Sequence, residues 1–433
     1  MVAHHHHHHH HKTTHPSSSG GGKHSRTYYA DTATSCIHPP YSHIATTVNN
    51  SWQIYSVLPR PTLVVTRPGP HPTAGPPTRA VLLRDTNVVV VVCGEKTVTL
   101  WDELAKAAVW TIDCAEDVCG VAALDGFVAI LHPTSADIYT LLPKPTLFRT
   151  IPTYLNPQGL HSQTATSITL PGAHRGQVSH TTQLSPGTSP STTLISAHTA
   201  PISALATSHS ATLVASASET GTLVRVWACK RGAPPTLLRE LRRGVERATV
   251  WSLAFDEREQ AVCVASNTLT VHIFTLAEPA ASSGALSSGA SDQQASASSP
   301  SRAAVASTPD SPEGKNRTSI LEPLAPYIPL PKYFSSTWSF AHFRIPDDRS
   351  PHDRDVQVTP CTAVFLSQHL ARGDSADSGF GATSSGSSTN RQIIAVLRGL
   401  SLHLFEYDTR RGGEATSVAY YRIKTPSAVA GES

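Results

Sequence analysis

The segments Trp-Ser-Leu-Ala-Phe (251–255), Ala-Val-Cys-Val-Ala-Ser (261–266) and Thr-Val-His-Ile-Phe (270–274) decide the fold of this chain. Each segment is short and rich in apolar or β-branched residues, and polar turn residues separate it from the next. This pattern is typical of β-strands joined by tight turns. Three such strands in succession predict most of one four-stranded blade of a β-propeller.

The stretch before these segments has the same spacing. It contains Ile-Ser-Ala-Leu-Ala (202–206), Leu-Val-Ala-Ser-Ala-Ser (213–218) and Thr-Leu-Val-Arg-Val-Trp (222–227), and Val-Thr-Leu-Trp-Asp (98–102) is a further copy of the last strand. The spacing is close to the ~40–45 residues of a WD-type repeat. Without the tail and the low-complexity segments, roughly 340 residues remain, which suffices for seven such blades. We therefore predict an all-β protein with a seven-bladed β-propeller of the WD-repeat type.

Three segments lie outside this pattern. Residues 1–26 include eight consecutive histidines and are expected to form a disordered tail, which is either a purification tag or a native tract. Residues 27–433 are predicted to form a single propeller. Within it, residues 277–331 and 372–390 are rich in small and polar residues, so they are expected to be flexible inserted loops, because strand patterns resume after each.

The composition restricts the class of function. The chain has 433 residues, a formal net charge of +3 and 15% charged residues, which is too neutral for a general nucleic-acid binder. Its seven cysteines include no Cys-x-x-Cys pair, so we expect reduced thiols in the cytosol and no metal site. No apolar run approaches the ~18 residues of a transmembrane helix. No catalytic motif is present, so neither enzymatic activity nor a cofactor is expected.

Two adjacent arginines, Arg242 and Arg243, lie between two predicted strands in the run Glu-Leu-Arg-Arg-Gly (240–244). Successive side chains of an extended chain point to opposite faces. The pair is therefore expected to head two separate anion sites, which suits a membrane that carries phosphoinositides. The alternative is that both are surface charges paired with Glu240 and Glu246.

Several motifs in one order resemble the PROPPIN family. They are Thr-Tyr-Leu-Asn-Pro-Gln-Gly-Leu (153–160), Leu-Pro-Gly-Ala-His-Arg-Gly-Gln-Val (170–178), Ala-His-Thr-Ala-Pro-Ile-Ser (197–203), Ala-Ser-Glu-Thr-Gly-Thr-Leu-Val-Arg-Val-Trp (217–227), Leu-Arg-Arg-Gly (241–244), Thr-Val-His-Ile-Phe (270–274) and Lys-Tyr-Phe-Ser-Ser-Thr-Trp-Ser-Phe-Ala (332–341). PROPPINs are seven-bladed propellers that bind phosphoinositides and act in autophagy. Leu241 stands where phenylalanine is more familiar, which indicates the Leu-Arg-Arg-Gly branch.

The resemblance implies two headgroup sites at the rim of blades five and six. Site one would comprise His198, Ser218, Thr222, Arg225 and Arg242, and site two would comprise Arg243, Thr249, Ser266, Thr270 and His272. Arginine donors and short hydroxyls suit phosphate oxygens, and a histidine donor would strengthen as the pH falls.

Some of these residues also have ordinary structural explanations. Ser218 and Thr222 are common in turns, and His198 resembles the histidine that forms a hydrogen bond within WD-type repeats. The role of His272 is left open between ligand and structure.

Site two departs from the family pattern in the run Ser-Asn-Thr-Leu-Thr (266–270), where Leu269 replaces a glycine. If that turn needs a positive φ, Leu269 is strained. Glu246 also places a negative charge near site two.

The family inserts a long loop from blade six, and Leu324, Tyr327, Ile328 and Leu330 are candidates for membrane insertion there. The alternative is that this apolar stretch packs under the propeller.

The resemblance therefore implies a cytosolic, monomeric protein that docks on autophagosomal-precursor, endosomal or vacuolar and lysosomal membranes. It would bind phosphatidylinositol 3-phosphate or 3,5-bisphosphate and recruit autophagy proteins, with a lipid-transfer protein as one candidate partner. The rival hypothesis is a WD-repeat scaffold that binds proteins only.

Overall fold

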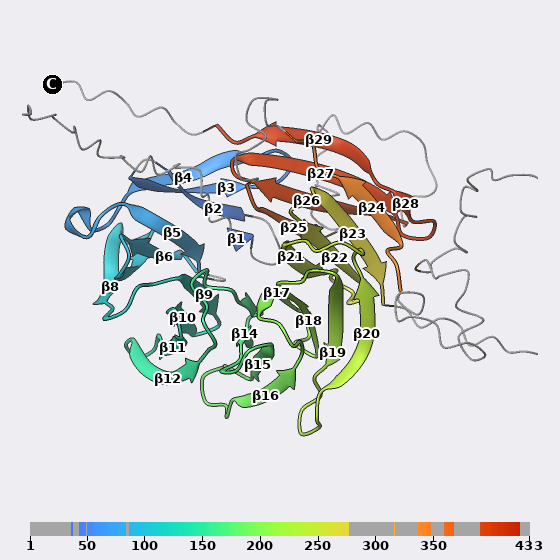
Figure 1. Ribbon diagram of the computed structural model, residues 1–433. Coiled ribbons are helices and arrows are strands. Elements are labelled where there is room, and N and C mark those ends of the chain that lie inside the picture. The colour runs from blue at the N-terminus through green and yellow to red at the C-terminus, as the bar shows by residue number, and fades with distance from the viewer. Residues whose placement is uncertain are drawn as a thin grey trace, which may run out of the picture.

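The structure is a computed structural model that describes residues 36–37, 43–48, 50–83, 86–276, 316, 337–347, 359–367 and 390–424. The strands of these residues form seven sheets arranged in a ring around a central axis (Figure 1). This confirms the predicted seven-bladed β-propeller. Within the described ranges, no helix is long and apolar enough to cross a membrane.

The first four blades use strands in chain order. Blade one contains β1 (Cys36–Ile37), β2 (His43–Val48), β3 (Ser51–Ser56) and β4 (Thr62–Pro68), and blade two contains β5 (Pro77–Leu82), β6 (Val88–Cys93), β7 (Thr97–Asp102) and β8 (Ala107–Asp113). Blade three contains β9 (Gly120–Leu124), β10 (Phe127–Leu131), β11 (Ser135–Thr140) and β12 (Thr146–Pro152), and blade four contains β13 (Ser162–Gln163), β14 (Ile168–Pro171), β15 (Gln177–Thr182) and β16 (Ser191–Ser196). A short 3-10 turn, Pro72–Ala74, joins the first two blades.

The last three blades complete the ring. Blade five contains β17 (Ile202–Thr207), β18 (Leu213–Ser218), β19 (Leu223–Ala228) and β20 (Thr236–Arg242), and blade six contains β21 (Val250–Phe255), β22 (Ala261–Ser266), β23 (Thr270–Thr275) and β24 (Ala341–Arg344). Blade seven contains β25 (Cys361–Phe365), β26 (Arg391–Arg398), β27 (Ser401–Asp408) and β29 (Thr416–Arg422). Strand β28 (Gly413–Glu414), from the turn between β27 and β29, pairs in parallel with β24 and extends blade six.

Burial falls from the inner strands of each blade to the outer ones. Every residue of β9, β10 and β22 is buried, whereas most residues of β8 and β12 are exposed. Neighbouring blades cover the inner strands on both faces, so these strands are continuous apolar runs without polar alternation. The hydrophobic core therefore lies between the blades.

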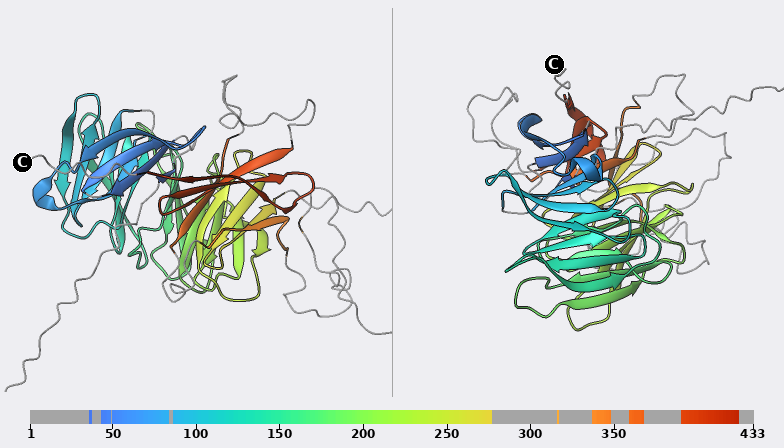
Figure 2. Two further views of the ribbon diagram at one scale, coloured as in Figure 1. Left: turned by 90° about the horizontal axis from the view of Figure 1, so that it is seen from above. Right: turned by 90° about the vertical axis from the view of Figure 1, so that its left-hand side faces the viewer.

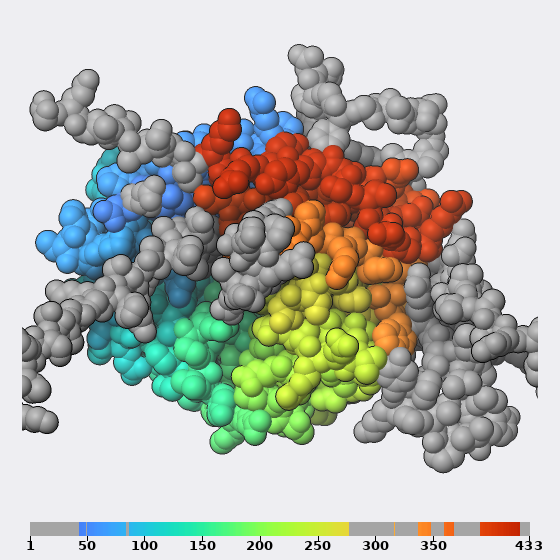
Figure 3. Space-filling view, turned by 45° about the horizontal axis from the view of Figure 1, so that its top comes forward, coloured from blue at the N-terminus to red at the C-terminus, as the bar shows by residue number. Residues whose placement is uncertain are grey.

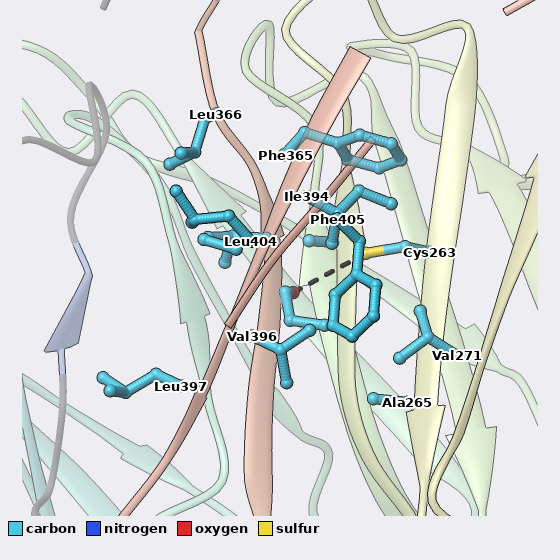
Figure 4. Close-up of a cluster of buried hydrophobic side chains, with 14 of the residues drawn as sticks. Cys263, Ala265, Val271, Phe365, Leu366, Ile394, Val396, Leu397, Leu404 and Phe405 are labelled. Atoms are coloured by element: carbon cyan, nitrogen blue, oxygen red, sulfur yellow. Dashed lines mark hydrogen bonds between the residues drawn. The ribbon is translucent and has the colours of Figure 1, made fainter. Parts of the chain in front are cut away.

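The packing of blade six on blade seven illustrates this core. Figure 4 shows Cys263 and Val271 of blade six facing Phe365 and Phe405 of blade seven. The buried Ser252 hydroxyl lies 3.0 Å from the amide nitrogen of Ala363, from which it accepts a hydrogen bond. These contacts fix blade six, and with it the predicted second site, relative to the rest of the ring.

The ring closes by packing between blades one and seven. Blade one contains only N-terminal strands and blade seven only C-terminal strands, and the two lie side by side in the space-filling view (Figure 3). The Tyr55 hydroxyl donates to the carbonyl oxygen of Lys424 at 3.3 Å, and the Tyr421 hydroxyl donates to that of Pro59 at 3.3 Å. Hydrogen bonds and apolar contact therefore join the two ends, and the described strands of each of these two blades come from one end of the chain.

Candidate functional site

Arg242 and Arg243 lie at the end of β20, the outer strand of blade five. The Arg242 amide donates to the carbonyl oxygen of Thr337 at 2.8 Å, and the Arg243 amide donates to that of Thr222 at 3.0 Å. Thr222 belongs to blade five, whereas Thr337 precedes the outer strand of blade six. The two amides therefore point in opposite directions, as the sequence predicts for an extended chain.

Their neighbours on β20 show what each side of the strand faces. Glu240 pairs with Arg225, which also donates to the carbonyl oxygen of Ala197 at the end of blade four. Leu241 is fully buried in the apolar cluster between blades five and six. Side chains alternate along a strand, so Arg242 lies on the side of Glu240 and Arg243 on the side of Leu241.

The predicted site residues lie at one face of the ring. Strands alternate in direction within a blade, so the turn between its second and third strands and the connection to the next blade both leave at the same face (Figure 2). Four segments belong to this face: 197–201, 218–222, 242–249 and 266–270. The fold thus gathers the residues of both predicted sites along the rim of blades four to six.

One of the two cations of site one, Arg225, is held in place by its neighbours. Arg225 donates from Nε to the Glu240 carboxylate at 2.9 Å and from Nη1 to the Ala197 carbonyl oxygen at 2.6 Å. Glu240 therefore forms an ion pair with Arg225. A phosphate group at site one would have to compete with this carboxylate for the guanidinium.

The small polar residues of site one form local hydrogen bonds. The buried Ser218 hydroxyl lies 2.9 Å from the Thr220 hydroxyl. Nε2 of His198 lies 3.0 Å from the Ser216 hydroxyl, inside blade five. This bond matches the structural role that WD-type repeats suggest for His198.

At site two, Arg243 is the most enclosed residue. It is only 6% exposed, and its guanidinium donates to the carbonyl oxygens of Gly221 (from Nε, 2.6 Å) and Glu246. These bonds use two of the five N–H groups of a guanidinium. Burial lowers the pKa of Arg243, and the nearby Glu246 opposes that shift. The backbone carbonyl oxygen of Glu246 therefore helps to hold the Arg243 guanidinium in place.

The hydroxyl residues of site two range from buried to exposed. Ser266 is fully buried and its hydroxyl lies 2.9 Å from that of Thr268, while the Thr270 hydroxyl donates to the Thr268 carbonyl oxygen at 3.4 Å. Thr249 is exposed, and its amide donates to Oδ1 of Asn267 at 3.0 Å. Thr249 and the partly buried Thr270 are therefore the more accessible hydroxyls of this set.

His272 lies on β23, and its ring contacts two polar residues, Ser339 and His342. Its Nδ1 is 3.2 Å from the Ser339 hydroxyl, and its ring stacks on that of His342 with centroids 6.4 Å apart. The structure brings His272 close to the outer edge of blade six.

The turn of site two contains the strained residue that the sequence suggested. Leu269 has a φ of 57°, and its amide donates to the Ser266 carbonyl oxygen at 3.0 Å. Gly221 occupies the matching place in blade five, with a φ of 62°, and its amide donates a hydrogen bond to the Ser218 carbonyl oxygen at 2.9 Å. Blade six therefore keeps the backbone geometry of blade five without its glycine, at a cost of roughly 1–2 kcal/mol.

Sequence reasoning missed Arg344 as a candidate for site two. This exposed residue ends β24 and pairs directly with Thr270 on β23. Residues paired in neighbouring strands have adjacent side chains. A long insertion separates the two residues in the sequence, so their spacing gave no signal.

The candidate membrane-insertion residues Leu324, Tyr327, Ile328 and Leu330 lie outside the described residues. The same holds for nearly all of 277–331 and 372–390 and for the whole of 1–26.

Both candidate histidines are neutral at physiological pH. Burial lowers the pKa of His198 to about 4, with the nearby Arg225 acting in the same direction. Burial likewise lowers the pKa of His272 to about 4, with Arg243 and His342 adding to the effect. A histidine contribution to anion binding would therefore begin to grow only well below pH 6.

We expect the free energy of unfolding to fall as the pH drops from about 6.5 to 4. In that window the unfolded chain binds protons that the folded histidines exclude, so acid favours unfolding. Thermal unfolding followed by circular dichroism at several pH values measures this slope. His198→Asn is expected to reduce the slope by one histidine, and an unchanged slope would contradict the lowered pKa of His198. His272, His161 and His180, whose pKa values burial also lowers, account for the rest of the slope.

Part of this chain resembles proteins of a known family. The PROPPIN family model matches residues 148–294. SVP1-like protein 2 of Debaryomyces hansenii is 36% identical over 125 residues, which is 29% of this chain and 24% of the relative. SVP1-like protein 2 of Emericella nidulans is 28% identical over 256 residues, 59% of this chain and 72% of the relative. Autophagy-related protein 18e of Arabidopsis thaliana is 30% identical over 183 residues, 41% of this chain and 47% of the relative.

Solved structures share the fold. Hsv2 of Kluyveromyces lactis superposes with a TM-score of 0.61 at 15% identity, covering 90% of this chain and 98% of that one. KlAtg21, solved in complex with the coiled coil of AgAtg16, gives a TM-score of 0.58 at 13% identity with the same coverage. The family match and the curated relatives together support the PROPPIN family for this chain.

Proposed function

We propose that this protein is a PROPPIN that docks on membranes carrying phosphatidylinositol 3-phosphate or 3,5-bisphosphate and recruits autophagy proteins there. The observation that carries the proposal is the placement of Arg242 and Arg243 on opposite sides of the end of β20, the outer strand of blade five. Each arginine heads a separate group of hydroxyl and histidine residues. Two anion sites side by side suit a surface with many phosphorylated headgroups.

The chemistry of each site fits a phosphate group. Guanidinium groups donate charge-assisted hydrogen bonds to phosphate oxygens, and serine and threonine hydroxyls complete the shell. In site one the cations are Arg225 and Arg242. In site two they are Arg243 and Arg344, the latter added by its pairing with Thr270.

Binding requires local rearrangement at both sites. A phosphate group at site one would replace the Glu240 carboxylate as a partner of Arg225. At site two the phosphate group would bind the N–H groups of Arg243 that do not donate to Gly221 or Glu246. Arg243 is buried, so the residues that cover it would have to move. Each site alone should therefore bind weakly. Two sites on one rigid propeller raise the avidity, because the second headgroup binds at a high effective concentration.

The same proposal covers location and partners. We infer a non-enzymatic, monomeric protein of the cytosol that associates peripherally with autophagosomal-precursor, endosomal or vacuolar and lysosomal membranes. The complex of KlAtg21 with the AgAtg16 coiled coil is a precedent for recruitment of a protein partner by this fold. A lipid-transfer protein of the autophagy machinery is a second candidate partner, which only the family resemblance suggests.

The protein-only scaffold is the second candidate function. It is favoured by the ion pair between Arg225 and Glu240 and by the burial of Arg243 and Ser266, because these contacts occupy groups that a headgroup would need. This candidate predicts no dependence on phosphoinositide.

Vesicle flotation with defined headgroups separates the two candidates. The protein is mixed with phosphatidylcholine vesicles that contain phosphatidylinositol, its 3-phosphate or its 3,5-bisphosphate, at physiological salt. We expect flotation with both phosphorylated lipids and little with phosphatidylinositol. Equal flotation with all three lipids would reject the proposal and favour the scaffold.

A further inference from the structure

Blade seven repeats the strand pattern that carries site two in blade six. Its third strand, β27, begins Ser-Leu-His-Leu-Phe (401–405), and the third strand of blade six, β23, begins Thr-Val-His-Ile-Phe (270–274). In each strand the centroid of the histidine ring lies 6.4 Å from that of the phenylalanine ring two residues later. The two strands therefore present a hydroxyl, a histidine and a phenylalanine in the same order along one face.

The outer strands of these two blades also end alike. Thr270 of β23 pairs with Arg344, the last residue of β24, and Ser401 of β27 pairs with Arg422, the last residue of β29. Directly paired residues of antiparallel strands have their side chains on the same face, with Cβ atoms about 4.5–5.5 Å apart. Blade seven therefore places an arginine beside a hydroxyl, as site two does.

A second arginine lies on the other side of Ser401. Arg398 ends β26 and pairs with Ser401 across a tight turn. Arg398 is only 7% exposed, its Nη1 donates to the carbonyl oxygen of Pro346 at 2.9 Å, and its Nη2 lies 3.8 Å from Oδ1 of Asp347. Ser401 thus lies between two arginines in one row across three strands, with Arg398 buried and Arg422 exposed.

This row faces blade six, whose strands lie beside those of blade seven (Figure 1). Phe405 is on the same face of β27 as Ser401, and its ring stacks on that of Phe343 from β24 with centroids 4.0 Å apart. The turn between the second and third strands of blade seven leaves at the same face of the ring as the turns that follow Ser218 and Ser266. The row therefore lies at the blade six–seven junction, on the rim that holds the two proposed sites.

Arg422 is an accessible cation. It is exposed, and within the described residues its side chain forms no ion pair or hydrogen bond. Asp347, an acidic neighbour of the row, lies against Arg398. Ser401 is partly buried, and its hydroxyl lies 3.4 Å from that of Tyr420. A phosphate group can therefore meet the Arg422 guanidinium without displacing a carboxylate from it, in contrast to site one.

We propose that Ser401 and Arg422, with Arg398 beside Ser401, form a third anion site that takes a phosphate group of a phosphorylated inositol headgroup. A guanidinium and a short hydroxyl are the donors that suit phosphate oxygens at site two. The ligand class rests on the proposed function, since the third site is assigned by its likeness to site two. The third site goes beyond that function, because the propeller then holds headgroups at three successive junctions of the ring.

The test is labelling of arginines in the full chain with phenylglyoxal, followed residue by residue by mass spectrometry. Labelling rates are measured without ligand, with inositol 1,3-bisphosphate, which is the soluble headgroup of phosphatidylinositol 3-phosphate, and with inorganic phosphate at the same concentration. At about ten times its dissociation constant, inositol 1,3-bisphosphate is expected to slow the labelling of Arg422 about tenfold, because only the unliganded site reacts. Arg344 reports on site two in the same experiment. Arg258, exposed on the turn between β21 and β22 at the opposite face of the ring, is the matched control and should not change.

The outcomes separate the third site from the proposed function. Slower labelling of Arg422 with the headgroup, and little change with inorganic phosphate, supports the third site. Unchanged labelling of Arg422 would overturn it and would mean that blade seven repeats only the packing of blade six; the proposed function stands in that case if Arg344 is protected or the protein floats with the phosphorylated lipids, and fails otherwise. Equal protection of Arg422 by inorganic phosphate would assign the site to free phosphate and overturn the headgroup assignment.

The variant Arg422→Ala checks the site at the membrane. The side chain is exposed and without a partner among the described residues, so the native thermal transition should remain. Apparent affinity for vesicles with phosphatidylinositol 3-phosphate is expected to fall about fivefold, which corresponds to the ~1 kcal/mol that a basic residue contributes near an anionic bilayer. Arg258→Ala should leave this affinity unchanged. Equal affinity of Arg422→Ala and the unaltered protein would overturn the assignment of the third site to a membrane headgroup.

Discussion

Flotation with vesicles that contain phosphatidylinositol 3-phosphate is expected to be lost when Arg242 and Arg243 are both replaced with threonine. The replacements remove one cation from each proposed site. They therefore weaken the charge-assisted bonds at both sites and, with them, the avidity that joins the sites. A loss of at least a hundredfold in apparent affinity is expected, since linked sites commonly contribute ~10²–10⁴ over single ones.

The structure calls for a folding control in this experiment. Arg243 is buried and donates to Gly221 and Glu246, so its replacement leaves two carbonyl oxygens without their donor. Arg242 is only half-buried, so Arg242→Thr alone should keep the native thermal transition while it removes one of the two cations of site one. Arg258→Thr, at the opposite face, controls for the lost charge. If the folded double variant floats as well as the unaltered protein, the arginines do not bind the lipid.

The sequence predicted the inner strands of the blades better than any other part of the fold. The predicted segments 251–255, 261–266 and 270–274 correspond to β21, β22 and β23 within one residue at each end. Inner strands are buried on both faces, so their apolar runs are unbroken and easily recognised. Outer strands such as β12 are mostly exposed, and polar residues and a proline interrupt their apolar residues, which makes the pattern harder to recognise.

The splay of the arginine pair was also predictable, because it follows from the pleat of any extended chain. The contacts of each guanidinium group could not be predicted from the sequence. The bond from Arg243 to Gly221 joins residues 22 positions apart, and the Arg225 pair with Glu240 depends on the register of β19 on β20. Arg344 reaches Thr270 only because β24 pairs with β23 across the insertion. Such contacts depend on tertiary structure, which local spacing does not encode.

Leu269 is an instructive intermediate case. The departure from the family pattern suggested that Leu269 would be strained if the turn needs a positive φ, and the structure has a φ of 57° there. The sequence did not show how the strain is accommodated. Leu269 is buried in the core between blades six and seven, and its carbonyl oxygen accepts the Ile345 amide at 2.8 Å. Apolar burial thus offsets a backbone cost of roughly 1–2 kcal/mol.

Blade five has no such compensation, so we expect Gly221→Ala to destabilise the protein by about 3 kcal/mol. Alanine at a φ of 62° costs about 1–2 kcal/mol, and the added Cβ atom would also lie 1.6 Å from the Ala248 carbonyl oxygen. The turn and the 242–249 connection must then move apart. Because Arg243 binds the Gly221 carbonyl oxygen, lipid flotation is expected to weaken together with stability.

The matched control for this prediction is Gly232→Ala on the turn between β19 and β20. Gly232 has a φ of 72°, but a Cβ atom there would meet nothing within 4 Å. Its replacement should cost only the backbone strain, about 1–2 kcal/mol, and leave flotation intact. Thermal unfolding of both variants measures the difference. Equal destabilisation would mean that backbone conformation alone matters, and that the close contact with Ala248 does not constrain the rim where the two arginines diverge.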